Sequence, residues 1–345
     1  MSPPLITHLY TADPSAHVFE GKIYIYPSHD RETSIQFNDN GDQYDMADYH
    51  VFSTSSLTPP YNITDHGVVL RTEDIPWVSK QLWAPDAAAK NGKYYLYFPA
   101  RDKDGIFRIG VAESSEGPAG PFMPDREPIR GSFSIDPAVF VDPGDGAAYL
   151  YFGGLWGGQL QCYQGTNSKS KNGGQDESVD GVPPFDAAWL GPKEPSGKDA
   201  RALFPKVAPL SEDMHAFSSP ARDLVILAPE TGAPIPADDH DRRFFEAAWM
   251  HKRGDKYYFS YSTGDTHYLV YAVGDSPLGP MTYAGRILEP VLGWTTHHSI
   301  VEFEGRWWLF YHDCEMSKGV SHLRNVKVAE IFYDDEGRIL PVKIE

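Results

Sequence analysis

Apolar and aromatic positions along the chain fall into short runs, and each run is interrupted by a polar turn that contains glycine. The segment FFEAAWMHKRGDKYYFSYSTG, residues 244–264, is typical: its pattern predicts two β-strands joined by a tight turn. One acid, Glu246, stands among its aromatic and small residues. Burial of an unpaired ionised carboxylate is costly and shifts its pKa. Packing alone therefore does not account for Glu246, and a functional role is indicated.

The same arrangement occurs four more times along the chain. The related segments begin at Ala12, Trp83, Ile135 and Thr296, and each has a polar head residue, a short strand, a glycine turn and an aromatic strand. The five equivalent head residues precede their turn glycines by about six to ten positions, and they are Asp13, Asp86, Asp136, Glu246 and His297. Such self-similarity is typical of repeat architectures.

The repeat predicts an all-β fold, a five-bladed β-propeller formed by residues 1–345 as a single domain. Five units average about 69 residues, more than the common propeller repeats, so the surplus is expected in loops. The polar, glycine-rich residues 165–186 are interpreted as a surface excursion within the third blade. A pair of β-sandwiches is the alternative, but it gives no reason for five units.

Propeller geometry predicts that the five head residues converge. The innermost strand of each blade borders the central channel, so residues at equivalent stations can face one cavity at one end of the axis. Asp before Pro is also an ordinary turn initiator, and only the recurrence in register favours a site. Several carboxylates in one cavity suit either a hard cation or acid/base catalysis. Because the acids are scattered, unlike those of a calcium loop, acid/base catalysis is favoured. Hydrolysis of a glycosidic bond is a reaction that needs such a pair, one carboxylic acid and one carboxylate.

Glu246 is the candidate general acid. Phe244 lies two positions away and is expected on the same face of the strand, while Ala248 leaves room beside the carboxyl group. An apolar wall of this kind raises a carboxyl pKa by desolvation. Phe244 is therefore also a candidate substrate contact.

Asp13 is the candidate general base. Pro14 is expected to hold Asp13 in extended geometry, and the hydroxyls of Thr11 and Ser15 would favour its ionised form. Asp136, also before a proline, is a third carboxylate that could raise the pKa of the acid by like-charge repulsion and orient it.

Composition supports a β protein that binds uncharged partners. The chain has 31 Gly, 29 Pro and 13% aromatic residues, which suits short strands and tight turns. A formal net charge of −18 repels nucleic acid and anionic membrane surfaces, so we expect neither as a partner. Saccharides fit this constraint.

Targeting signals and disulfides are not expected. No apolar stretch is long enough to span a bilayer, and residues 1–15 do not resemble a signal peptide, so a cytoplasmic location is expected, with a secreted mature form left open. Cys162 and Cys314, the only cysteines, are expected to be free buried thiols.

These motifs resemble glycoside hydrolase family 43, five-bladed propeller enzymes that act as β-xylosidases, α-L-arabinofuranosidases and arabinanases. The resemblance runs from about Asp13 to the end of the last unit. It is carried by ADPSAHVF around Asp13, SIDPAVFVD around Asp136 and FFEAAWMH around Glu246. It implies general base, pKa modulator and general acid at these three residues, and inversion of anomeric configuration with acid and base about 6.5–9.5 Å apart.

Further contacts follow from the resemblance. Trp83 of WAPD is expected to offer an aromatic face to a sugar ring, or else to lie buried between blades. Arg324 falls where family members carry an arginine that bonds sugar hydroxyls; an exposed strand arginine is the alternative. His297 of THHSIVEF matches a channel histidine that contacts a calcium ion in many members, whereas His298 is expected to point the other way. No cofactor is expected to be required for the chemistry; a structural calcium at His297 and a purely structural or substrate-contacting histidine both stay open.

The predicted function is an inverting exo-glycosidase that releases xylose from β-1,4-xylooligosaccharides, with α-L-arabinofuranosidase as the near alternative. The expected partner is a xylo- or arabino-oligosaccharide, and the oligomeric state is left open. The acid motif EAAW departs from the E-G-P form of some family β-xylosidases, which leaves the substrate in doubt. From other classes, a non-catalytic carbohydrate-binding propeller stays open. A metal-dependent hydrolase built on His17, His29, His297 and His298 is disfavoured, because no ligand spacing such as H-E-x-x-H occurs.

Overall fold

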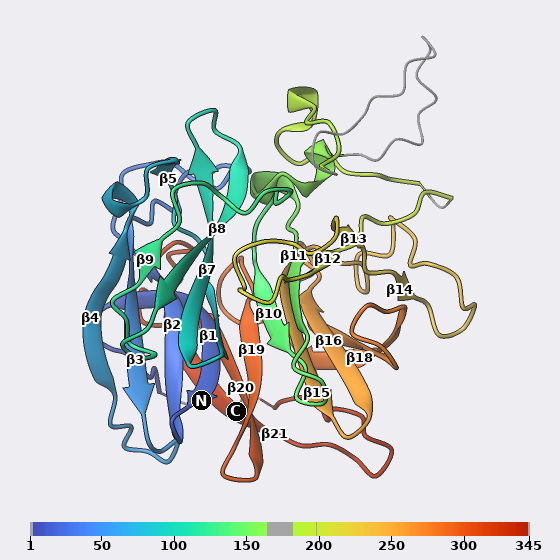
Figure 1. Cartoon of the computed structure of the whole chain (residues 1–345). Coiled ribbons are helices and arrows are strands. Elements are labelled where there is room, and N and C mark those ends of the chain that lie inside the picture. Colours follow the sequence, from blue (N-terminus) through green and yellow to red (C-terminus); the bar gives the residue numbers. More distant parts are fainter. Residues whose placement is uncertain (1–2, 164–181, 198, 344–345) are drawn as a thin grey trace.

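Five sheets follow one another around a central axis and confirm the predicted five-bladed β-propeller (Figure 1). The computed structural model describes residues 3–163, 182–197 and 199–343. Of the excursion predicted at residues 165–186, residues 165–181 lie outside the described residues. Both cysteines are buried free thiols, as predicted. In the described ranges, no helix has the length and apolar character needed to cross a membrane.

The first two blades come from the N-terminal part of the chain. Blade 1 consists of β1 (Tyr10–Phe19), β2 (Lys22–Asp30), β3 (Asp48–Thr54) and β4 (Thr64–Arg71). Blade 2 consists of β5 (Val78–Lys80), β6 (Asp86–Lys90), β7 (Lys93–Asp102), β8 (Phe107–Ser114) and β9 (Met123–Pro124), preceded by the 3₁₀ turn η1 (Thr72–Asp74).

The remaining blades complete the ring. Blade 3 consists of β10 (Ala138–Val141), β11 (Ala148–Phe152), β12 (Lys206–Pro209) and β13 (Arg222–Asp223), with the 3₁₀ turns η2 (Trp156–Gly158), η3 (Leu160–Cys162) and η5 (Ala187–Trp189) in its long connection. Blade 4 consists of β14 (Ile226–Leu227), β15 (Glu246–Arg253), β16 (Lys256–Ser262), β17 (Leu269–Gly274) and β18 (Met281–Leu288). Blade 5 consists of β19 (His298–Phe303), β20 (Arg306–Asp313) and β21 (Asn325–Ile331).

Three turn glycines of the repeat, Gly21, Gly92 and Gly305, close two-residue hairpins. Strand pairs such as Phe19 with Lys22, Lys90 with Lys93 and Phe303 with Arg306 leave only two residues in the turn. Both turn residues then have positive φ, as in Asn91 (55°) and Gly92 (75°). A turn of this type matches the right-handed twist of the strands and favours glycine at its second position. In these three blades the recurring glycine therefore marks the tip of the inner hairpin, whereas the turn of blade 3 between Val141 and Ala148 is longer.

The ring is closed by its first strand. The inner strands β1, β6, β10, β15 and β19 contact one another in sequence, and β19 contacts β1. The backbone N–H groups of Leu5 and Thr11 also donate to the carbonyls of Val326 and Arg324 in and before β21, at 2.9 and 3.0 Å. In Figure 1, β1 lies next to β20 and β21 of the last blade, which it contacts. Because each blade is covered by the next, apolar clusters lie between the blades and leave the axis free for polar groups.

Candidate active site

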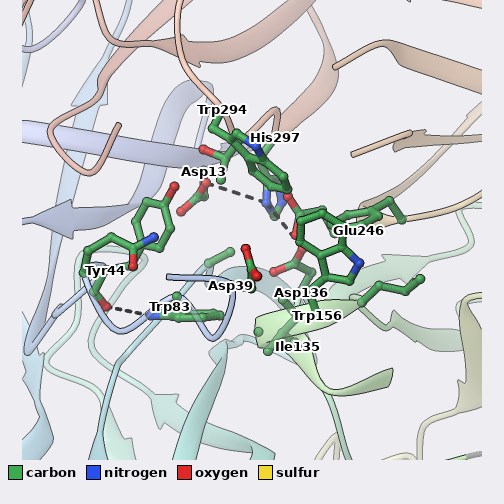
Figure 2. Close-up of a pocket in the computed structure, with 18 of the residues that line it drawn as sticks. Asp13, Asp39, Tyr44, Trp83, Ile135, Asp136, Trp156, Glu246, Trp294 and His297 are labelled. Atoms are coloured by element: carbon green, nitrogen blue, oxygen red, sulfur yellow. Dashed lines mark hydrogen bonds and ion pairs between the residues drawn. The ribbon is translucent and has the colours of Figure 1, made fainter. Parts of the chain in front are cut away.

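A pocket opens where the heads of the inner strands meet. Figure 2 shows the carboxyl groups of Asp13, Asp136 and Glu246 together with His297. Aromatic side chains surround them, and these are Phe37, Tyr44, Trp83, Trp156, Phe245 and Trp294. A cavity with a few converging charged groups and apolar walls is the usual form of a small-molecule site.

The backbone at the three acids is irregular. Asp13 and Asp136 have φ values of 47° and 56°, in the left-handed region. Asp13 lies where β1 shifts its register between Ala12 and Ser15. The prediction that Pro14 would hold Asp13 extended is therefore wrong, since the bulge determines the local geometry. Bulges of this kind re-aim a side chain next to an active site, and backbone strain concentrates at such sites.

Asp13 is held as a carboxylate. Its Oδ1 accepts from Nη1 of Arg324 at 2.9 Å, and its Oδ2 accepts from the hydroxyl of Ser28 at 2.7 Å. Burial raises its pKa, but the positive charge of Arg324 and the neighbouring His312 and His297 outweigh this and lower the pKa to about 2. The sequence also predicted an ionised Asp13, but the hydrogen-bond partners that it predicted, Thr11 and Ser15, are wrong.

Ser15 and Thr11 do not bond to Asp13. The Ser15 hydroxyl donates to Asp86, and the Thr11 hydroxyl has no partner among the described residues. The backbone N–H of Asp13 donates to Nδ1 of His312 at 3.0 Å. Burial and the charge of Arg324 lower the pKa of His312 to about 3, so its imidazole is neutral and can accept this bond.

Asp136 and Glu246 form a pair of interacting acids. Burial raises the pKa of both groups. The pKa of Glu246 lies well above 4.5, because burial is reinforced by the negative charges of Asp136 and then Asp13 beside it. The pKa of Asp136 rises only to about 6, since His297 opposes the effect of burial. Asp136 also accepts the backbone N–H of Ala247 at 2.7 Å. Its charged form is thus stabilised by a hydrogen bond, and Glu246 holds the proton of the pair.

The apolar wall beside Glu246 differs from the prediction. Phe244 is buried, with 1% of its surface exposed, and packs against Phe259 and Tyr261 away from the pocket. Phe245, Ile135 and Trp156 line the pocket instead. The interpretation of Phe244 as a substrate contact is therefore wrong. The alternation of a regular strand does not apply, because β15 begins only at Glu246 and has a bulge between Glu246 and Trp249, with Ala247 at φ 63°.

His297 lies between two of the acids. Its Nδ1 is 3.8 Å from Oδ1 of Asp13 and 3.7 Å from Oδ2 of Asp136, the contacts drawn as dashed lines in Figure 2. One imidazole thus bridges the two carboxylates at the centre of the pocket. His298 points the other way, as predicted: it is fully buried and its Nε2 lies 2.6 Å from the hydroxyl of Ser260.

Arg324 is a buried anchor in the pocket floor. Its guanidinium and backbone bind both oxygens of Asp30 at 2.8–2.9 Å, and one arm reaches Asp13. The alternative of an exposed strand arginine is wrong, since 2% of its surface is exposed. A planar fork that binds two carboxylates fixes their orientation as well as their charge.

Trp83 forms part of the pocket wall. Its indole N–H donates to the carbonyl of Tyr44 at 2.8 Å, and its ring lies 4.6 Å from that of Phe107. Only 8% of its surface is exposed, and this part faces the pocket. Trp83 is therefore both packed between blades and available at the cavity, so the two interpretations of it are not exclusive.

Asp86, the remaining head residue, does not line the pocket. It is 1% exposed and accepts from Nε2 of His17 at 2.6 Å, from its neighbour Ala87 at 2.7 Å, and from the backbone of Val139. These partners lie on the inner strands of three blades. The predicted convergence of all five heads is wrong at this position, because Asp86 starts a regular strand and its carboxylate serves to tie strands together.

Several lining residues were not predicted. Phe37 and Asp39 come from the long connection between β2 and β3, Trp156 from η2, and Trp294 and Thr295 from the segment before β19. Phe37 keeps 55% of its surface exposed at the pocket. These residues lie outside the repeat, and only the aromatic character of Phe37, Trp156 and Trp294 gave a signal.

Comparisons with known proteins agree with this geometry. The model of the glycosyl hydrolases family 43 matches residues 3–183 and 200–339. The chain is 74% identical over 342 residues to xylosidase/arabinosidase 43A of Humicola insolens, covering 99% of both chains. It is 50% identical to a β-xylosidase of Xylanibacter ruminicola, covering 97% of both.

Among solved structures, the fold is similar to a β-xylosidase/α-arabinofuranosidase from a compost microbial metagenome. That crystal structure is a calcium-free complex with xylotriose, with a TM-score of 0.88 and 56% identity over 99% of this chain and 97% of that one. A GH43_1 enzyme from Xanthomonas citri, also complexed with xylotriose, matches with a TM-score of 0.86 and 50% identity over 99% and 93% of the two chains.

Proposed function

The chain belongs to family 43 of the glycosyl hydrolases, and from this premise we propose that it is an inverting exo-glycosidase that releases xylose from the non-reducing end of β-1,4-xylooligosaccharides. One observation carries the proposal: a protonated Glu246 and an ionised Asp13 share a pocket with aromatic walls. This is the pair of protonation states that inverting hydrolysis of a glycosidic bond requires.

Glu246 acts as the general acid. Its raised pKa keeps it protonated near neutral pH, and part of its side chain opens into the pocket. It donates its proton to the glycosidic oxygen as the bond to the anomeric carbon breaks, so the leaving sugar departs as an alcohol. As the pH rises through the pKa of Glu246, the acid form is lost and the rate falls.

Asp13 acts as the general base. It accepts a proton from a water that attacks the anomeric carbon on the face opposite to the leaving group. A carboxylate with a pKa of about 2 is a weak base towards bulk water. It suffices here, because a water that bonds to an oxocarbenium-like carbon becomes strongly acidic in the transition state.

Asp136 and Arg324 position these two groups. Asp136 fixes the backbone at Ala247, next to Glu246, and its negative charge raises the pKa of the acid. Arg324 keeps Asp13 ionised and holds one of its oxygens, so the other faces Ser28. Both residues act through their neighbours and prepare the charge distribution before substrate binds.

The aromatic walls suit an uncharged pyranose. The C–H faces of a sugar pack on aromatic rings, which Trp83, Trp156 and Trp294 offer around the carboxyl groups. The relatives named β-xylosidase and those solved with xylotriose support xylooligosaccharides as substrates. Relatives named xylosidase/arabinosidase support α-L-arabinofuranosidase as a second activity of the same site.

A calcium ion fits this pocket only as a hydrated ion. Calcium prefers six to eight oxygen ligands, while both Asp13 oxygens and Oδ2 of Asp136 already accept hydrogen bonds. His297 would face such an ion, with water supplying most of its shell. The ion would add positive charge near the three acids, but every proton transfer above uses only residues of the chain.

The experiment that tests the function compares initial rates on an aryl β-xyloside and an aryl α-L-arabinofuranoside, with NMR detection of the first anomer formed. We expect faster turnover of the xyloside and α-xylose as the first product. Release of β-xylose would refute the inverting mechanism, and faster turnover of the arabinofuranoside would favour the second activity.

A further inference from the structure

A second group of chemically active side chains lies on blade 1, outside the pocket-lining set. His29 belongs to β2, and Asp48 and His50 belong to β3, the neighbouring strand. One nitrogen or oxygen atom from each of the three lies within 4.8 Å of the others. Their side chains are 17%, 20% and 13% exposed, so solvent and small ions reach them.

The strands bring these groups together on one face. Asp48 and His50 are two positions apart and so project from the same side of β3. Nδ1 of His29 lies 2.6 Å from Oδ1 of Asp48, while Nε2 of His50 lies 3.8 Å from the same oxygen, beyond a hydrogen bond. Ligand atoms around a tetrahedral zinc ion are about 3.4 Å apart, given metal–ligand distances of about 2.0–2.2 Å. An increase of about 0.8 Å in the first separation and a decrease of about 0.4 Å in the second would bring these two pairs to that spacing.

An outer shell already orients one of the imidazoles. Oδ1 of Asp65 lies 3.2 Å from Nδ1 of His50, and accepts the backbone N–H of Gly67 at 2.7 Å. The other oxygen of Asp65 lies 2.8 Å from Nε2 of His8. When Nδ1 of His50 donates to Asp65, the lone pair of its Nε2 points towards Asp48. A carboxylate behind a histidine in this way is the usual second shell of a metal ligand.

We propose that His29, Asp48 and His50 bind a divalent transition-metal ion of the zinc class, with Asp65 orienting His50. Two imidazoles and one carboxylate favour zinc, nickel or copper over calcium and magnesium, which prefer oxygen ligands. Binding through Nδ1 of His29 displaces the proton that this nitrogen shares with Asp48, and in a neutral imidazole that proton moves to Nε2. Water completes the coordination.

The charges around the group agree with a divalent cation. With neutral imidazoles, Asp48 and Asp65 bring two negative charges to this face. Arg31 is the cation that acts on Asp48, and it is itself paired with Asp45 at 2.9 Å. The ion would join β2 to β3 next to Asp30, which holds Arg324, so we expect it to stabilise blade 1. The inference is independent of the proposed function.

The test is titration of the chelator-treated full chain with zinc chloride by calorimetry, together with the visible spectrum of the cobalt(II) form. We expect one saturable site with micromolar or tighter affinity, a zinc-dependent rise in Tm, and a d–d spectrum that indicates nitrogen and oxygen ligands. His29→Ala and His50→Ala should weaken binding by at least about 100-fold, and Asp65→Asn by about 10–100-fold, as expected for an outer-shell residue.

The matched control is His66→Ala. His66 follows Asp65 on β4 but bonds to Ser53 at 2.8 Å and stacks on Tyr24, so zinc affinity should stay unchanged. Circular dichroism verifies that each variant is folded, and His29→Gln replaces His29→Ala if the latter is not. The proposal is overturned if zinc does not bind, if both ligand variants bind it as tightly as wild type, or if only His297→Ala abolishes binding, which would place the ion at the catalytic pocket.

Discussion

Substitution of Glu246 by Gln tests the acid directly, because it replaces one hydroxyl oxygen by an amide nitrogen with almost no change of shape. The amide cannot donate a proton to a departing sugar. Contacts to the ring are otherwise retained, so binding of xylotriose should change little. The negative charge of the buried Asp136 helps to raise the pKa of Glu246, and ionisation of Glu246 sets the alkaline limb of the pH profile. The Gln side chain does not titrate, so the variant should lose this limb.

The size of the effect follows from the environment of Glu246. A carboxyl group with the ordinary pKa of 4.5 would be protonated in only roughly 0.3% of molecules at pH 7. The raised pKa therefore increases the active population by up to about 300-fold. General acid catalysis contributes about 10²–10⁴-fold, so we expect kcat on xylobiose to fall by about 10⁴-fold, equivalent to roughly 5.5 kcal/mol.

The assay uses two substrates that differ in their need for a proton. Xylobiose releases a poor leaving group and depends fully on the acid, whereas a dinitrophenyl β-xyloside releases an anion that is stable without protonation. We expect a loss of about 10⁴-fold on the first and less than about tenfold on the second. Asp39→Asn is the matched control, because Asp39 is another acid in the pocket lining and its loss should affect the two substrates alike.

Equal losses on both substrates would refute the assignment of Glu246, because a residue that only binds or positions the sugar does not distinguish leaving groups. An alkaline limb that persists in the variant would refute it independently.

Other substitutions test the neighbouring groups. Asp136→Asn should move the alkaline limb to lower pH by removing a charge that raises the pKa of Glu246. Burial raises the pKa of Asp136 from 3.8 to about 6, so its ionisation opposes folding as the pH rises through this range; the variant should have a higher Tm than wild type at pH 7 and a similar Tm below pH 3.8. Asp13→Asn should reduce kcat on the dinitrophenyl xyloside as strongly as on xylobiose, because the attacking water needs its base with either leaving group; a loss confined to xylobiose contradicts this role. Phe244→Leu should cost about 1 kcal/mol of stability and leave KM unchanged, whereas Phe245→Leu should raise KM; the reverse pattern in melting and initial-rate measurements would contradict the placement of the two rings.

The propeller and its catalytic acids could be predicted because repetition is visible in the sequence. In three blades a glycine marks the second residue of a two-residue hairpin, and each head residue precedes its turn glycine by about six to ten positions. The repeat thus identifies Asp13, Asp136 and Glu246 as equivalent residues before the fold is known. Asp86 shares the station but not the role, because its carboxylate accepts from His17, Ala87 and Val139 on the inner strands.

The remainder of the site depends on features that have no periodic signal. Bulges at Asp13 and Glu246 override the strand alternation that had placed Phe244 beside the acid. Phe37, Trp156 and Trp294 come from connections whose paths are decided by packing between blades. Arg324 is likewise brought to Asp13 by closure of the ring, across 311 residues, which local sequence does not encode.

Closure of the ring has a consequence for biosynthesis. Asp13 and Arg324 are 311 residues apart in the chain, and their ion pair forms across the junction where the N-terminal strand meets the last blade. During translation, the general base Asp13 lacks its cationic partner Arg324 until almost the whole chain has been synthesised. Catalytic competence thus appears only at the end of synthesis, and a nascent or truncated chain is expected to be inert towards its substrate.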